Sequence, residues 1–178
     1  WLTPFSVMTG VAVVIGYALL GATWLVWKCE GPMQDHFRGL ALTLMFAMLA
    51  MIGIVSLWTP ALDPAIAARW FEMPQILYTA PVPLMVLGLA VVLFRSLNGT
   101  RDALPFLASL ALFLVTFAGL GISLYPNIVP PTITIWEAAA PDSSLAFLLA
   151  GAAVLIPMIL AYSAYAYWIF RGKVRPGE

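Results

Sequence analysis

The feature that most constrains this chain is a set of five long apolar stretches that contain no acidic or basic side chain and no histidine. They run from Phe5 to Trp27, Gly39 to Trp58, Ile76 to Phe94, Leu104 to Leu124 and Leu145 to Phe170. None contains Asp, Glu, Lys, Arg or His. A helix of about 20 residues crosses a hydrocarbon core about 30 Å thick. Because a charge at the centre of such a helix costs at least about 2.5 kcal/mol, the pattern predicts five membrane-spanning helices.

The composition supports an all-α, polytopic integral membrane protein. Of the 178 residues, 63% are hydrophobic and 9% are charged, and the mean hydropathy is +0.99. A soluble domain is about 45–50% apolar and about 25% charged, so this chain could not cover a soluble core with polar surface. We expect one transmembrane domain over residues 1–178. The net charge of zero gives no indication of a nucleic acid partner.

The start of the chain and its cysteine count set two further limits. The sequence opens at Trp1 rather than Met, without the basic region and cleavage site of a signal peptide. We therefore expect a fragment of a longer protein. Cys29 is the single cysteine, which excludes an internal disulfide and a cysteine-based metal site.

Lysine and arginine residues predict how the spans are oriented. Seven follow or precede spans on one side: Lys28, Arg38, Arg95, Arg101, Arg171, Lys173 and Arg175; the opposite side has only Arg69. The positive-inside rule places the seven, and the C-terminus, on the cytoplasmic side. On the outer side, Ala65 to Phe71 is expected to form a short interfacial helix. At the cytoplasmic side, Asp102 is expected to cap the fourth span.

The histidine and methionine residues of the chain could in principle bind a metal or haem, but their sequence context favours non-catalytic interpretations. His36, the only histidine, lies in the sequence Gln-Asp-His-Phe-Arg38. A loop or interfacial role, in which His36 bonds Asp35 or, alongside Arg38, lipid phosphate, is favoured over metal or haem ligation. Met45, Met48 and Met51 recur every third residue along one helix face. Methionine can be an axial haem ligand, but such a row is more often adaptable packing. We therefore predict no catalytic, cofactor-binding or metal-ligating residue.

The spans also lack the ionisable groups of an ion pathway. Their polar residues are hydroxyls, which more often join helices than line a route: Thr43, Ser56, Ser109, Thr116, Ser123, Tyr162, Ser163, Tyr165 and Tyr167. Small residues on the first span, Ala12 with Gly16 and Ala18 with Ala22, predict close packing on a neighbour. The chain is expected to be a membrane scaffold.

The second outer connection, Tyr125 to Ser144, is the most distinctive loop. Pro130 and Pro131 stiffen it into extended backbone, and Trp136 and Glu137 place an amphipathic ring and an acid at the interface. A structural loop and a docking surface for a partner's extramembrane segment both fit this composition.

This loop and several flanking motifs resemble the C-terminal part of subunit II of cytochrome bd-type quinol oxidases, most closely the cyanide-insensitive branch. The resembling segments are Pro126-Asn-Ile-Val-Pro-Pro, Thr134-Ile-Trp-Glu-Ala-Ala, Ser143-Ser-Leu, Ile156-Pro-Met-Ile-Leu-Ala-Tyr-Ser-Ala-Tyr-Ala-Tyr-Trp168, Phe170-Arg-Gly-Lys-Val174, Gly16-Tyr-Ala-Leu-Leu-Gly-Ala-Thr-Trp24 with Lys28 and Gly31, and His36-Phe-Arg38. They follow the family's order along essentially the whole chain.

The resemblance implies that these are the last five of about eight helices, with the last four, Gly39 to Phe170, forming a four-helix bundle. It implies a complex that oxidises quinol and reduces dioxygen to water, with haems b and d bound by the partner, subunit I. No cofactor is then bound by this chain, and its partners are subunit I, membrane lipid and quinol. The family's proton-delivery acids lie in N-terminal helices that have no counterpart here. A membrane transporter or channel fragment without redox role, or an adaptor, is the alternative.

Overall fold

The computed structural model describes residues 2–62, 64–129 and 132–173, which form two compact units. One unit comprises the chain up to Tyr125, and the other runs from Pro126 to Lys173. The helices of the first are α1 (Pro4–Lys28), α2 (Pro32–Leu62), α3 (Pro64–Phe71), α4 (Ile76–Thr79), α5 (Pro81–Leu97) and α6 (Leu104–Leu124). The second contains β1 (Asn127–Val129), β2 (Ile133–Thr134) and α7 (Asp142–Ile169).

Five segments are long and apolar enough to cross a membrane, as the sequence predicted. They are Pro4–Lys28, Pro32–Leu62, Ile76–Leu97, Leu104–Leu124 and Asp142–Ile169. The third combines α4 and α5, which join at Ala80 with helical backbone angles. The all-α, polytopic fold is confirmed. A single domain over the whole chain stays a prediction.

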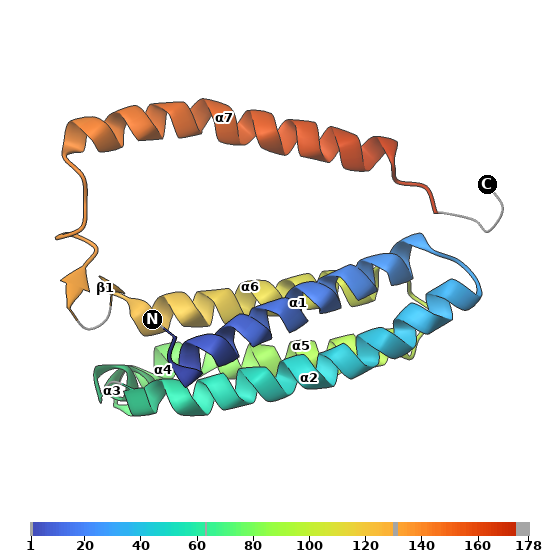
Figure 1. Ribbon diagram of the computed structural model, residues 1–178, viewed down its shortest axis with the longest axis horizontal. Helices are drawn as coiled ribbons and strands as arrows, with labels where there is room; N and C mark the ends of the chain where they lie inside the picture. The colour runs from blue at the N-terminus through green and yellow to red at the C-terminus, as the bar shows by residue number, and fades with distance from the viewer. Residues whose placement is uncertain (1, 63, 130–131, 174–178) are drawn as a thin grey trace. The chain divides into compact units, whose positions relative to one another are not determined.

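In the first unit, α1, α2, α5 and α6 run side by side, while α3 and α4 lie together at one end (Figure 1). Helix α1 packs against α2 and α6, and α5 packs against α6 and α2. The packed group thus includes α1, which the family resemblance had placed outside the four-helix bundle. Helix α1 can approach its neighbours closely because Gly16 has no side chain. An added Cβ there would lie 3.4–3.5 Å from Met48 of α2 and Phe113 of α6.

The core of the first unit is apolar and draws on all four long helices. Its buried members are Leu19, Ala22, Ala41, Met45, Met48, Leu93, Leu97, Ala108 and Leu112. Met45 is only 1% exposed, which confirms packing as the role of the methionine row, with Met51 half-buried beside it. Of the small residues predicted to pack, Gly16 and Ala22 are buried, whereas Ala18 is exposed within this chain.

Helix α2 begins well before the apolar stretch that predicted it. Gly31 has a φ of +68°, which a residue without a Cβ adopts readily, and Pro32 then occupies the first helical position. The segment from Met33 to Arg38 is therefore helical rather than a loop. The hydropathy pattern placed the start of this span at Gly39, directly after the charged segment. The helix itself begins at Pro32, about two turns earlier.

The second unit contains a short hairpin and one long helix. Strands β1 and β2 are antiparallel, with Asn127 opposite Thr134 and Val129 opposite Ile133. Pro130 and Pro131, two residues of the predicted docking motif, lie outside the described residues. Helix α7 starts directly after Pro141 and retains Pro157 in its interior.

Candidate functional site

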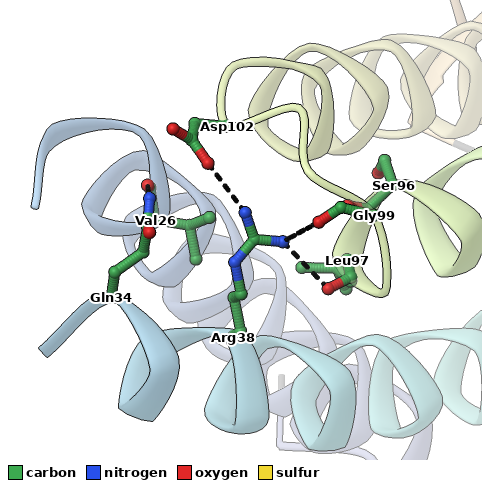
Figure 2. A network of polar contacts seen from close by, with 7 residues as sticks. All are labelled: Val26, Gln34, Arg38, Ser96, Leu97, Gly99 and Asp102. Atoms are coloured by element: carbon green, nitrogen blue, oxygen red, sulfur yellow. Dashed lines mark hydrogen bonds and ion pairs between the residues drawn. The ribbon is translucent and has the colours of Figure 1, made fainter. Parts of the chain in front are cut away.

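Arg38 is the centre of a polar network at one end of the four packed helices (Figure 2). Its guanidinium Nη2 lies 2.7 Å from Oδ1 of Asp102, and Nη1 donates to the carbonyls of Leu97 at 3.0 Å and Gly99 at 2.9 Å. The side chains of Arg38 and Asp102 are 16% and 26% exposed. One side chain of α2 thereby joins the end of α5 to the loop before α6.

This arrangement contradicts the predicted role of Asp102. The residue that caps α6 is Ala103, which makes no side-chain capping bond, and the Asp102 carboxylate instead accepts from Arg38. The carboxylate is attracted more strongly by a cationic guanidinium than by a neutral backbone N–H where both side chains are largely withdrawn from water. Arg38 is accordingly bonded to neighbouring groups of the protein.

Gln34, one turn earlier on α2, performs a similar task for α1. Its Nε2 donates to the carbonyl of Val26 at 2.7 Å (Figure 2). The last carbonyls of a helix have no partner within that helix, so donors from outside satisfy them. The first turns of α2 thus supply donors to the C-terminal ends of both α1 and α5. This bond was not predicted, because the local sequence around Gln34 does not show which helix end lies beside it.

His36 lies on the same stretch of α2 but takes no part in the network. Its side chain is exposed, and its ring lies 5.6 Å from the Phe37 ring, centroid to centroid. Within the described part of the chain, no three His, Cys, Asp or Glu side chains gather closely enough to hold a metal ion. Met45 and Met48 lie in the apolar core without a histidine opposite them.

Arg69 forms a second arginine clamp at the opposite end of the first unit. Its Nη1 donates to the carbonyls of Ile122 at 3.1 Å and Ser123 at 2.9 Å. The indole Nε1 of Trp70 donates to Oγ of Ser123 at 3.0 Å. The predicted interfacial helix is α3, and these bonds fix it to the C-terminal end of α6.

The two clamps agree with the predicted separation of basic residues. Lys28, Arg38, Arg95 and Arg101 belong to the ends of α1, α2, α5 and α6 that meet around the Arg38 network, whereas Arg69 lies at the other end. We call the end with four basic residues the basic end.

Between the two ends, one hydroxyl pair links helices inside the apolar region. Oγ1 of Thr23 on α1 lies 2.9 Å from Oγ of Ser109 on α6, and both residues are buried. This bears out the expectation that Ser109 joins helices, although Thr23 was not among the hydroxyl residues that the sequence analysis selected. No buried side-chain nitrogen or oxygen of the described residues lacks a hydrogen-bond partner. The buried polar side chains of these residues are serines and threonines, and all of them are hydrogen-bonded.

The loop that precedes α7 in the second unit contains a compact turn around Glu137. Its Oε2 accepts from the amide N–H of Thr134 at 2.8 Å and from the Thr134 hydroxyl at 2.9 Å. These bonds hold the pKa of the Glu137 carboxyl below its ordinary value. Trp136 is 64% exposed beside it. The turn presents an aromatic ring on a backbone that the acid fixes.

Comparison with known proteins gives the context for this scaffold. The family model described as cytochrome bd terminal oxidase subunit II matches residues 1–170. The chain belongs to this family. It is 25% identical over 204 residues to the cytochrome bd-I ubiquinol oxidase subunit 2 of Escherichia coli strain K12. It is also 25% identical, over 205 residues, to the probable cytochrome oxidase subunit 2 of Haemophilus influenzae.

Each of these alignments covers 97% of this chain and 53% of the relative, so the chain spans about half the length of the relatives it matches. Membership of the bd oxidase subunit II family confirms the resemblance drawn from the sequence motifs. The same relatives are subunits of an oxidoreductase, as their names state. The assignment to the cyanide-insensitive branch stays a prediction.

Proposed function

We propose that this chain is part of a non-haem-ligating membrane subunit of a bd-type quinol:oxygen oxidoreductase. Its role is to pair with the haem-bearing subunit I, to stabilise it, and to limit the access of water to the haems. The observation that carries the proposal is the family match over residues 1–170. The reaction of the complex is the oxidation of quinol and the reduction of dioxygen to water, with haems b and d held by subunit I.

The side chains of the first unit support a scaffolding role. The donors and acceptors at the helix ends are used within the chain by Gln34, Arg38 and Arg69. The five apolar stretches contain no Asp, Glu, Lys, Arg or His, and between α1 and α6 they bury the hydroxyl pair of Thr23 and Ser109. A rigid uncharged surface of this kind packs against another helical subunit through shape and small residues.

The proposed location is a bacterial cytoplasmic membrane with the basic end in the cytoplasm. The support is the arrangement of Lys28, Arg38, Arg95 and Arg101 at one end of the packed helices, against Arg69 at the other. The C-terminal tail with Arg171 and Lys173 would lie on the same side as the basic end. The outer hairpin and the Trp136–Glu137 turn would then face the periplasm.

We assign docking on subunit I to the turn of Trp136 and Glu137. An exposed tryptophan on a fixed backbone is a common anchor at protein interfaces, since little entropy is lost when it is buried. Pro130 and Pro131 of the same motif would limit the conformations of the hairpin. His36 and Arg38 lie at the basic end. There Arg38 would stabilise the conformation of the α5–α6 loop.

The test is purification of the full-length complex from cells that carry Trp136→Ala, with Ile128→Ala as the matched control on the same hairpin. Ile128 is also exposed, at 57%, but lies outside the Thr134–Glu137 turn. We expect Trp136→Ala to reduce the amount of subunit I recovered and the haem d absorbance per complex, with the control unchanged. A deletion of the whole subunit that left the haem d spectrum and quinol oxidase rate intact would contradict the stabilising role. Substrate flux in haem-free vesicles would instead support a transporter.

A further inference from the structure

The loop between α5 and α6 surrounds a shallow open depression of about 400 Å³ at the basic end. Its walls include Val92 and Arg95 of α5, Thr100 and Arg101 of the loop, and Leu104 of α6. Because α5 and α6 are both candidate membrane spans, the short connection between them lies at a membrane surface. The depression is therefore positioned where lipid headgroups meet the protein.

Two guanidinium groups lie at this depression without an acid to neutralise them. Arg95 and Arg101 are both exposed, and neither forms an ion pair within the described part of the chain. Asp102, the acid next to Arg101 in the sequence, has its carboxylate Oδ1 2.7 Å from Nη2 of Arg38. Arg38 thus neutralises the carboxylate of Asp102. The two exposed guanidinium groups then give the depression a net positive charge.

The same clamp gives the depression its shape. Arg38 donates to the carbonyls of Leu97 and Gly99, which fixes the backbone that carries Thr100 and Arg101. An added Cβ at Gly99 would lie 3.2 Å from the Arg95 carbonyl oxygen, so the turn is too tight for a side chain to fit without a shift. A backbone held in this way presents its two arginines to a ligand at little entropic cost.

We propose that this depression binds the phosphate headgroup of an anionic phospholipid, with Arg95 and Arg101 on the phosphate and the first part of an acyl chain against Val92 and Leu104. Arginine pairs with phosphate through two parallel N–H···O bonds, and basic sites at the ends of membrane helices select anionic lipids. The apolar wall and the position at the bilayer surface favour a lipid over soluble phosphate. This site is separate from the proposed docking turn and does not depend on it.

The experiment uses the full-length subunit in its complex, delipidated in detergent and titrated with phosphatidylglycerol or phosphatidylcholine under native mass spectrometry. The variants are Arg95→Gln, Arg101→Gln and the double substitution. The matched control is Arg171→Gln with Lys173→Gln, which removes two positive charges elsewhere. We expect phosphatidylglycerol to bind about fivefold more weakly for each depression arginine removed, with the control close to wild type. Equal loss in the control would show general charge attraction and overturn the site.

A second measurement on the unmodified complex keeps the proposal testable if a variant does not fold. Hydrogen exchange of residues 98–104 is expected to slow on addition of phosphatidylglycerol, but not of phosphatidylcholine or inorganic phosphate. Protection by inorganic phosphate alone would identify a soluble anion and contradict the lipid assignment. Full protection in the delipidated complex would show that a protein segment covers the depression, and that result would also overturn it.

Discussion

The sharpest prediction concerns Arg38, because one side chain makes bonds of 3.0 Å or less to three separate partners. Arg38→Met removes the ion pair with Asp102 and the donors to the Leu97 and Gly99 carbonyls, but keeps much of the aliphatic stem. Asp102→Asn removes only the negative charge and leaves an oxygen that can still accept a bond. The structure therefore predicts that the arginine substitution lowers the unfolding free energy more than the aspartate substitution does.

The exposure of the pair sets the size of the effect. Ion pairs at a fully exposed surface contribute about 0–1 kcal/mol, whereas removing one member of a buried pair costs about 3–5 kcal/mol. With Arg38 16% exposed and Asp102 26% exposed, the pair lies between these limits. We expect a loss in unfolding free energy of about 2–3 kcal/mol for Arg38→Met and about 1 kcal/mol for Asp102→Asn. The double mutant should show a coupling of about 1 kcal/mol.

The assay is reversible chemical unfolding of the full-length subunit in mixed micelles without anionic lipid. Asp35→Asn is the matched control, since Asp35 lies one turn before Arg38 on α2 and is exposed. It should lower the unfolding free energy by no more than about 0.5 kcal/mol, the scale of a first-turn acid. Equal losses for Arg38→Met and Asp102→Asn, or the absence of coupling between them, would refute the three-partner clamp.

Three further experiments test the helix contacts and the turn around Glu137. A double-mutant cycle of Thr23→Val and Ser109→Ala should give a coupling of about 0.6 kcal/mol in the unfolding free energy, and none if the hydroxyls do not bond across helices. Gly119→Leu should destabilise the chain by about 1–3 kcal/mol because an added Cβ already lies 3.2 Å from a neighbouring side chain, whereas Gly121→Leu, in open space, should be neutral in the same assay. The carboxyl of Glu137 has a lowered pKa, so its stabilisation of the turn is complete above the ordinary value of 4.5 and disappears as the pH falls through the lowered value. Hydrogen exchange of the turn should therefore accelerate at acid pH in the wild type, beyond its intrinsic pH dependence, whereas Glu137→Gln should show no such added pH response.

The two arginine clamps also suggest why α3 and the α5–α6 loop are ordered in a chain with so few charges. A helix that ends near a membrane surface leaves carbonyls whose water supply is limited. Arg38 satisfies those of α5, and Arg69 satisfies those of α6. Each arginine also comes from a different element than the carbonyls it serves, so the same bonds fix a connection between elements.

The number of spans, their approximate positions and the family were all determined by the sequence. The reason is that the cost of placing a charge in hydrocarbon applies to each residue separately, and so can be read along the chain. Leu104–Leu124 is the same in the sequence analysis and in the structure. Helix α3 was predicted over Ala65 to Phe71 and is found at Pro64–Phe71. The methionine row was predicted to pack, and Met45 and Met48 are in the core.

The tertiary structure decided which polar residues meet and which helices pack together. Asp102 was expected to cap α6, and only the position of α2 shows that Arg38, 64 residues earlier in the chain, takes its carboxylate. The start of α2 at Pro32 and the place of α1 among the packed helices were decided in the same way. A bond between distant residues depends on how helices approach one another in three dimensions, and that approach depends on the fit of whole helix faces rather than on any local pattern.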